Sequence, residues 1–342
     1  MTPKDSSLFI PIAVEEEMDL MERVLFGISC FLHVPALFCL LKATPPHQAQ
    51  IKPFLIACQV SVVISDVYYS LFFEPTFVPE VDLIYCTGFL CRIAATSTAM
   101  GIYIYAIGAL ALSSLACIIA RHQGMMPITS RWKMTKKNRR AMIVGVLMAF
   151  TIPTTTFTVF PFDMNESDRL INESSYDLDW VRERGRYIKL PSNIFMHAIN
   201  WSAITCFIGT LVIAISLFTH MFYVLNHETV TSTHTKALIR LSLKRLSVQL
   251  NVPILLIAIP LIVLFLQIET RCFPIKTGTA AMFLTPFHPI VHNFVLLIIL
   301  PTYRNAIVGA VRNWRNPSIG NGPMTVRISI TTNLPQSRAR HQ

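Results

Sequence analysis

Four polar side chains inside otherwise apolar segments are the first candidates for chemistry. Asp66 places a carboxylate in one such segment, and His288, His292 and Asn293 lie together in another near the end of the chain. Carboxylates and imidazoles in apolar surroundings are costly unless they have partners. These groups could form a switch core linked to an ion or a proton, or they could be a hydrogen-bonded contact that only fixes packing.

A metal site is a weaker interpretation of the same residues. His288 and His292 are four residues apart, a spacing that suits two zinc ligands on one helix face. Pro289 stands between them, and the segment offers no third ligand. The eight cysteines form no C-x-x-C pair, which argues against zinc or redox chemistry. We therefore expect no metal and no cofactor.

The surroundings of these residues are those of a membrane protein. The 342-residue chain is 53% hydrophobic and only 14% charged, whereas soluble domains carry about 25% charged residues. A helix crosses a bilayer with about 20 apolar residues, and seven segments approach or exceed this length. They are Val24–Leu41, Pro53–Phe73, Ile93–Ala120, Ala141–Phe160, Ile194–Leu225, Val248–Ile268 and Thr277–Leu300. The sequence predicts an all-α membrane protein with a seven-transmembrane helix bundle.

Charge predicts the orientation. With the N-terminus outside, the inner segments hold 19 Lys and Arg residues and one acid, and the outer segments hold 10 basic and 17 acidic residues. Excess Lys and Arg marks the cytoplasmic side. The net charge of +10 is thereby explained without nucleic acid. The predicted regions are an extracellular segment (1–23), the bundle (24–300), a membrane-surface helix (301–316) and a disordered cytosolic tail (317–342).

Two further sequence patterns agree with this orientation. Ile307, Val311 and Trp314 recur at helical spacing among arginines, which predicts the amphipathic surface helix. The sequons at Asn165 and Asn172 fall in an outer loop, so we expect glycosylation there.

The polar side chains of the second and seventh spans are expected to lie at similar depths in the membrane. Asp66 lies 13 residues from Pro53, and His288 lies 12 residues from Leu300, which at about 1.5 Å per residue is roughly 20 Å and 18 Å from the inner surface. We therefore expect a polar switch core of Asp66, His288, His292 and Asn293, with Asp66 as a partner of His288.

Two other groups of residues are candidates for binding. Aromatic and polar side chains in the outer halves of the spans suit a small-ligand pocket, although each could equally serve helix packing. They are Tyr103, Tyr105, His197, Asn200, Trp201 and Gln267. The inner ends carry candidates for coupling to a cytosolic partner, where simple topology signals are the alternative. They are Arg121, His122, Lys136, Lys137, Tyr303 and Arg304.

The cysteines leave a single outer disulfide open. Cys86, Cys91 and Cys272 are the outer cysteines, so we expect Cys86 or Cys91 to pair with Cys272 and one thiol to stay free.

Several of these motifs occur in the same order in one known family. Ser65-Asp66 with Ser70, Pro75 and Pro79, then Arg121-His122-Gln123, then Phe287 to Asn293 and Pro301-Thr302-Tyr303-Arg304 resemble the nematode serpentine chemoreceptors of the Str-related superfamily. Class i looks closest and class h next. Two positions differ from rhodopsin-like receptors. Ala120 stands where those receptors have an acidic residue before the arginine, and Leu300 stands where they have the asparagine of Asn-Pro-x-x-Tyr.

The resemblance implies a chemosensory G-protein-coupled receptor in the plasma membrane of a sensory cilium. It implies that the chain binds a small odorant-like molecule from outside and activates a heterotrimeric G protein inside, and that it is not an enzyme. The alternative is a seven-helix ligand-gated channel or transporter, which would favour inverted repeats, broken helices or several buried charges.

Overall fold

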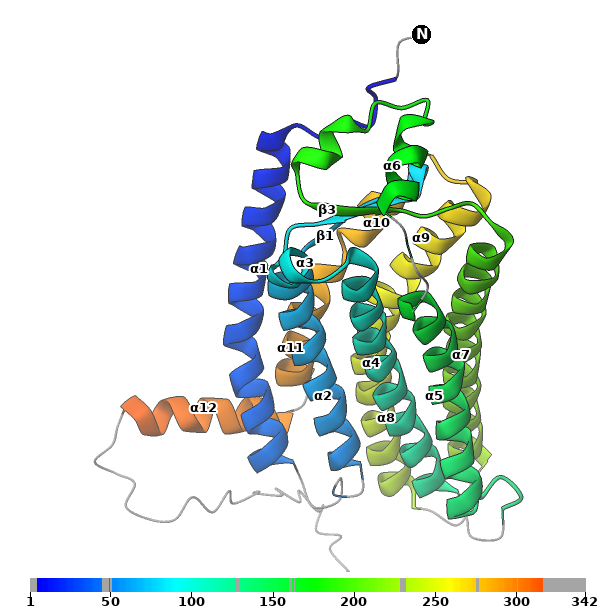
Figure 1. Ribbon diagram of the computed structural model, residues 1–342. Helices are drawn as coiled ribbons and strands as arrows, with labels where there is room; N and C mark the ends of the chain where they lie inside the picture. Colours follow the sequence, from blue (N-terminus) through cyan, green and yellow to red (C-terminus); the bar gives the residue numbers. More distant parts are fainter. Residues whose placement is uncertain are drawn as a thin grey trace, which may run out of the picture.

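The computed structural model describes residues 5–44, 49, 51–126, 130–159, 162, 164–227, 232–274, 277–299 and 301–315. Within these residues, seven helical segments are long and apolar enough to cross a membrane, and they lie side by side in one bundle (Figure 1). The segments are α1 (Ile12–Phe38), α2 (Lys52–Val67), α4 (Thr96–Met125), α5 (Lys136–Val159), α7 (Ile194–His227), α8 (Thr233–Pro253) with α9 (Ile259–Thr270), and α10 (Thr277–Met282) with α11 (His288–Ile299). The prediction of seven spanning helices is confirmed.

Four of these spans contain a stretch of non-α helix. The π-helical stretches are η1 (Cys39–Ala43), η3 (Tyr68–Phe73) and η6 (Ile254–Ala258), and η7 (Thr285–Phe287) is a 3-10 turn. Proline lacks an N–H and clashes with the preceding turn, so it interrupts a regular helix. Pro253 precedes η6, and Pro286 lies within η7. The sixth and seventh spans are therefore each divided into two helices.

The first helix begins earlier than the predicted span. α1 starts at Ile12, whereas the apolar segment was expected to start at Val24. Three acids, Glu15, Asp19 and Glu22, recur at spacings of four and three residues and are partly buried. They occupy the face of the helix where apolar residues are usual. Because this face is acidic, the first turns of α1 were not recognised as part of an apolar segment.

A small antiparallel sheet covers one end of the bundle, hereafter the sheet end. Its strands are β1 (Pro75–Val78), β2 (Leu83–Cys86) and β3 (Arg186–Lys189), in the order β1-β2-β3, with Tyr85 opposite Tyr187. Short helical pieces lie beside it: α3 (Phe89–Ile93), α6 (Met164–Asn172), η4 (Pro79–Val81) and η5 (Asp179–Glu183). The all-α prediction missed this sheet, because strands of four residues give too short a pattern.

The opposite end of the bundle carries α12 (Pro301–Arg315), which runs across the direction of the spans (Figure 1). We call it the α12 end. The helix covers the segment expected at 301–316, and its contact with a membrane surface stays a prediction. The predicted tail, 317–342, lies outside the described residues. α4 is the central helix of the bundle and packs against α2, α5 and α7.

Candidate functional site

An apolar cavity lies between α4, α5, α7 and α9 in the half of the bundle nearer the sheet end. Its volume is about 50 Å³, enough for more than one water molecule. Its walls are almost entirely apolar. They include Met100, Ile104, Ile107, Phe150, Pro153, Phe157, Ile199, Ala203, Phe207, Leu261, Leu264, Phe265 and Ile268.

The polar groups at this cavity are few and mostly satisfied. Thr154 donates its hydroxyl to the Phe150 carbonyl at 2.6 Å. Asn200 Nδ2 donates to Glu269 Oε1 at 2.7 Å, and Glu269 Oε2 lies 2.7 Å from His197 Nδ1. Glu269 thus joins two positions of α7 to α9 at the cavity's edge. The sequence analysis did not select Glu269, although its side chain is only 3% exposed.

The structure places two of the six predicted pocket residues in the cavity wall. Tyr103 and Asn200 line it. Tyr105 and Trp201 are 38% and 47% exposed on the outside of the bundle. His197 contacts Glu269 as described. Gln267 is buried outside the lining, where its Oε1 accepts a hydrogen bond from the Phe273 backbone N–H at 3.1 Å.

A second site is a buried polar network among α1, α2 and α11. Asp66 Oδ2 accepts a hydrogen bond from the Ser29 hydroxyl and lies 3.0 Å from His33 Nε2. On the other side of the His33 ring, Nδ1 is 2.9 Å from Asn293 Nδ2 and 3.2 Å from Gln59 Nε2. Gln59 Nε2 also donates to Asn293 Oδ1 at 2.7 Å. Five side chains from three spans are therefore connected.

The contacts of this network favour one tautomer of the neutral His33 ring. A carboxylate only accepts hydrogen bonds, so the hydrogen of a neutral ring belongs on Nε2, and Nδ1 accepts from the amides. A second proton on Nδ1 would face two N–H donors. The amides of Gln59 and Asn293 would then have to turn to present their oxygens. Gln59 Oε1 has no hydrogen-bond partner among the described residues.

The expected pairing of Asp66 with His288 was wrong, and the assignment of these residues to a switch stays a prediction. Asp66 and Asn293 do belong to one network, but the direct partner of Asp66 is His33 on α1 and not His288. His288 and His292 are buried beside each other, with ring centres 5.6 Å apart. Within the described structure, His288 Nε2 and His292 Nδ1 make no hydrogen bond. Depth along two helices could be counted from the sequence, but which faces meet depends on helix rotation.

Ser29, His33 and Gln59 were missed. Ser29 and His33 do have a sequence signal, because they continue the four-and-three spacing of Glu15, Asp19 and Glu22 along α1. That spacing repeats on one helix face. Ser29 and His33 are accordingly buried.

At the α12 end, two of the predicted coupling residues join helices to each other, and three are exposed charges. Arg121 Nη2 donates to the Ser242 hydroxyl at 2.9 Å, which joins α4 to α8. His122 Nε2 lies 2.8 Å from His220 Nδ1 on α7. Lys136, Lys137 and Arg304 are exposed. These three charges remain available to a partner.

Tyr303 does not fit the prediction of a partner-facing surface. It is fully buried, and its hydroxyl lies 2.9 Å from Thr44 Oγ1. Burial raises the pKa of this hydroxyl, so it stays protonated. Tyr303 therefore fixes the start of α12 against the end of the first span.

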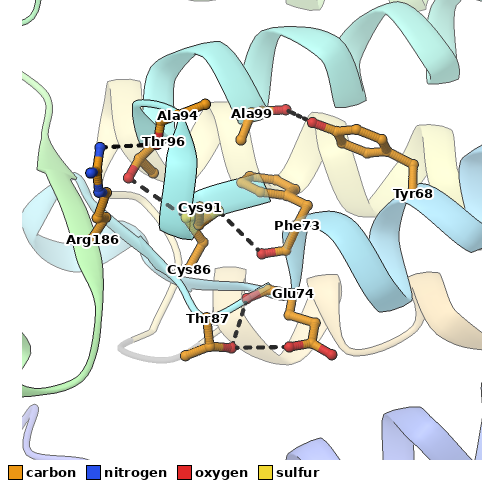
Figure 2. The surroundings of a disulfide bond; sticks show 10 residues. All are labelled: Tyr68, Phe73, Glu74, Cys86, Thr87, Cys91, Ala94, Thr96, Ala99 and Arg186. Atoms are coloured by element: carbon orange, nitrogen blue, oxygen red, sulfur yellow. Dashed lines mark hydrogen bonds between the residues drawn. A yellow bond between two sulfur atoms is a disulfide. The ribbon is translucent and has the colours of Figure 1, made fainter. Parts of the chain in front are cut away.

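The disulfide also differs from the prediction. Cys86 is bonded to Cys91, and Cys272 is a free, exposed thiol. Figure 2 shows α3 folded back on β2 at this bond, with Arg186 of β3 donating to the Ala94 carbonyl at 3.3 Å. Cys86 and Cys91 are only five residues apart, and the turn at Gly88 brings them together. The expected pairing with Cys272 is corrected.

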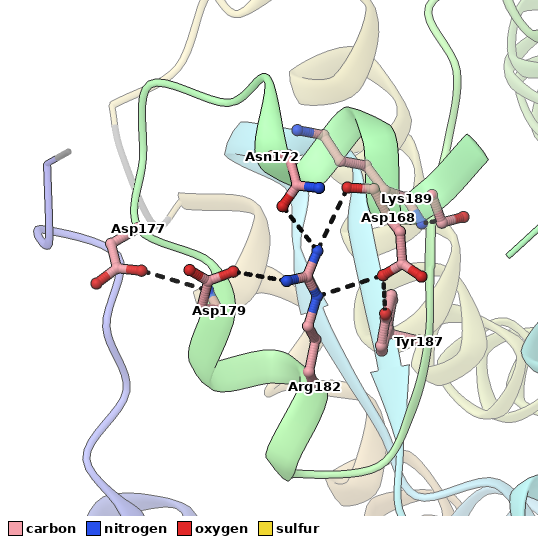
Figure 3. Close-up of polar contacts among 8 residues, drawn as sticks. Asp168, Asn172, Asp177, Asp179, Arg182, Tyr187 and Lys189 are labelled. Carbon is pink, nitrogen blue, oxygen red and sulfur yellow. Dashed lines mark hydrogen bonds and ion pairs between the residues drawn. The ribbon is translucent and has the colours of Figure 1, made fainter. Parts of the chain in front are cut away.

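The asparagines of both sequons lie on α6 at the sheet end. Asn165 and Asn172 are exposed, and their glycosylation stays a prediction. Asn172 Oδ1 accepts from Arg182 at 2.9 Å, within a cluster where Arg182 also contacts Asp168 and Asp179 (Figure 3). Burial, and then the hydrogen bond to Asp168, raises the pKa of Tyr187. The cluster ties α6 and η5 to the sheet.

The part of the chain that the structure describes contains no group of three His, Cys, Asp or Glu side chains placed to hold a metal ion. The arrangement as a whole is a small apolar cavity near one end, a polar network in the middle of the bundle and exposed bases at the other end. Nothing in the cavity wall resembles a nucleophile with its base.

Comparisons with known proteins agree with this arrangement. A profile of the family "Serpentine type 7TM GPCR chemoreceptor Srh" matches residues 14–313. The crystal structure of squid rhodopsin matches with a TM-score of 0.55 and 14% sequence identity, over 93% of this chain and 93% of that chain. At that identity the likeness shows a rhodopsin-like fold. No curated protein sequence matches.

Proposed function

Because the chain belongs to the serpentine 7TM GPCR chemoreceptor family Srh, we propose that it binds a small apolar odorant-like molecule in the cavity between α4, α5, α7 and α9. The predicted chemoreceptor superfamily is confirmed, with class h in place of class i. Family membership also confirms a multi-pass membrane receptor that is not an enzyme. The ligand, the G protein, the orientation and the sensory cilium belong to the proposal.

The apolar cavity wall carries the proposal for the ligand. Apolar walls with few polar groups select by shape and size. The volume of about 50 Å³ suits a molecule of a few heavy atoms, such as a short-chain alcohol, ketone or ester. Because Asn200 is held by Glu269 and Thr154 by its own helix, we expect the ligand to form few hydrogen bonds.

The sixth span offers a route from this cavity to the α12 end. Leu261, Leu264 and Phe265 of α9 line the cavity, and η6 separates α9 from α8. On α8, Ser242 accepts the hydrogen bond from Arg121. A ligand that packs better against a shifted α9 would stabilise an arrangement in which this bond is broken. The exposed bases Lys136, Lys137 and Arg304 would then contact an acidic surface of a heterotrimeric G protein.

The proposal assigns the polar network of Asp66, His33, Gln59, Ser29 and Asn293 to switching. The network joins the first, second and seventh spans in one hydrogen-bonded arrangement. Two discrete sets of hydrogen bonds are the physical requirement for a switch. Asp66→Asn at unchanged surface level should therefore alter the response to an agonist.

The test begins with a calcium-imaging screen of small apolar volatiles in cells that express the receptor. For an agonist found in this way, Ala203→Leu should raise the half-maximal concentration about tenfold by filling the cavity, since even one methylene changes binding by such factors. Ala198→Leu is the matched control, because Ala198 lies on the exposed face of the same helix. Equal responses of the two variants would exclude the cavity.

Coupling to a G protein is tested by a separate measurement of agonist binding. Guanine nucleotide should weaken agonist binding in membranes that contain a G protein, since binding to the two partners is reciprocal. An agonist-evoked current in a bilayer without any G protein would instead support the channel.

A further inference from the structure

A second cavity lies near the sheet end, between α1, β1 and α10, apart from the apolar cavity. Its volume is about 30 Å³. The two cavities share Phe77 in their walls and otherwise have different linings. The second cavity combines carboxylates with aromatic rings, a combination that the apolar cavity lacks.

Four carboxylates line this second cavity. Glu15, Asp19 and Glu22 come from one face of α1, and Glu74 follows η3 with a positive φ of 42°. All four are partly buried. A left-handed conformation is unusual for a residue other than glycine. It directs the chain sharply from the second span into β1 and brings the Glu74 carboxylate beside α1.

Among the described residues, only one of these four acids forms an ion pair. Arg184 donates to Glu15 and forms an ion pair with it. Among the described residues, Asp19 and Glu22 form no ion pair, and Glu74 accepts a hydrogen bond from Thr87 at 3.4 Å. Burial raises the pKa of Glu74, Arg23 opposes this rise, and Asp19 adds to it. Arg23 itself is exposed. The carboxylates therefore repel one another across the cavity.

The Tyr85 hydroxyl is an independent observation that points to a ligand in this second cavity. Tyr85 lines the cavity and is 0% exposed, and its Oη has no hydrogen-bond partner among the described residues. Burial raises the pKa of this hydroxyl, with smaller effects from Thr76 and Glu15 nearby. A buried hydroxyl without a partner costs roughly 1 to 3 kcal/mol. An N–H donor in the cavity would satisfy this oxygen.

The walls suit an organic cation better than a metal ion. Tyr69, Phe77 and Phe283 contribute aromatic rings, and ring faces attract ammonium groups. Calcium instead requires six to eight oxygens at close range, and no metal-holding group of side chains occurs in the described part of the chain. From these residues we infer that the cavity between α1, β1 and α10 binds a protonated amine of a few heavy atoms.

In this site the ammonium group lies between Asp19, Glu22 and Glu74, and it donates a hydrogen bond to Tyr85 Oη. The alkyl part of the amine contacts the aromatic rings. Glu22 is seven residues before Ser29 on the same face of α1, about 10 Å along the helix. An amine bound here is thus attached to the helix that holds the Asp66 network.

The test uses the whole receptor purified in lipid nanodiscs, with ethylammonium as the probe and ethanol as its neutral counterpart. Ethylammonium at pH 7 should raise the melting temperature in a saturable way, because a ligand that binds the folded state stabilises it. Ethanol, sodium and calcium at the same concentration should not reproduce this rise. If ethanol or calcium does reproduce it, the ammonium site is wrong.

Variants locate the site. Asp19→Asn with Glu22→Gln should weaken the apparent affinity for ethylammonium at least tenfold, and Tyr85→Phe should weaken it several-fold. Glu17→Gln is the matched control, because Glu17 is exposed on the same helix. Each variant is compared with its own melting temperature without probe, which separates binding from folding. Full retention of the ethylammonium effect in the double variant would overturn the proposal.

Discussion

The two sides of the bundle are built in opposite ways. On the side of α4, α5, α7 and α9, an apolar cavity is bounded almost entirely by aliphatic and aromatic side chains. On the side of α1, α2 and α11, five polar side chains form one connected network around Asp66. The first side can accept molecules of many chemical types if their shape fits. The second side can adopt only a few discrete arrangements.

In the proposed function, this difference separates ligand recognition by the cavity from switching by the polar network. Apolar cores tolerate exchanges of similar volume at a cost below about 1.5 kcal/mol, so the cavity can change its selectivity without loss of the fold. A buried polar network is more sensitive, because each atom that loses its partner is penalised. Substitutions on the two sides should therefore have effects of different size and kind.

The largest effect is expected for His33→Leu. This substitution removes the contact of His33 with a carboxylate that is only 4% exposed. A buried acceptor that loses its hydrogen-bond donor costs about 1 to 3 kcal/mol, and a charged acceptor such as this carboxylate costs more. The melting temperature of the purified receptor should fall sharply. Adding Asp66→Asn to His33→Leu should recover part of the loss, because the unpaired charge is then gone.

The matched control is Val34→Leu, at a position that is 70% exposed on the same helix. Its melting temperature should equal that of the unchanged receptor. If His33→Leu were as stable as this control, the network would contribute nothing to the fold.

The residues of this network show what the sequence could and could not predict. Asp66 and Asn293 were found, because a polar side chain within an apolar segment is recognisable at once. His33 lies within the predicted first span, Val24–Leu41, but it was not selected, because its burial against Asp66 depends on how α1 is rotated. The partner of Asp66 could not be known, since pairing across helices depends on how each helix is rotated.

The same distinction holds for the fold. Seven spans follow from segment length and hydropathy, which are local properties. The sheet at the sheet end depends on strands 100 residues apart, as with Tyr85 opposite Tyr187. The Cys86 to Cys91 bond depends on the turn that follows β2. The pairing of β2 with β3 is formed only in the folded chain, and the disulfide depends on the local turn at Gly88, which the cysteine positions alone do not specify.

An intermediate effect is expected for Gly101→Ala on the apolar side. A Cβ at Gly101 would clash with the Thr158 side chain of α5, so this side chain or the two helices would have to move. Overpacking of this kind typically costs about 1 to 3 kcal/mol. The melting temperature should fall less than with His33→Leu, and Thr158→Ala should restore part of it.

Gly108→Ala serves as the control for Gly101→Ala. Its Cβ would meet Phe150 at an ordinary 3.7 Å, and alanine favours a helix over glycine by about 1 kcal/mol. This variant should be neutral or slightly more stable. A Gly101→Ala receptor that melts like the Gly108→Ala receptor would show that α4 and α5 are not packed closely here.

The smallest effect on stability is expected from a change of pH. It should arise from buried carboxylates at the sheet end. Burial raises the pKa of Glu74 and of Asp82, with Arg271 opposing the rise at Asp82. The folded state therefore binds more protons than the unfolded state between the ordinary and the raised pKa values. Stability should rise slightly as pH falls through this window and decline again as pH increases.

Glu74→Gln separates this effect from general acid sensitivity. The glutamine cannot ionise, so the slope of melting temperature against pH should flatten in this variant. The apolar cavity has no carboxylate or histidine in its wall, so a cavity variant such as Ala203→Leu should keep the slope of the unchanged receptor. A slope that persists in Glu74→Gln but vanishes in Ala203→Leu would reverse the assignment of the two sides.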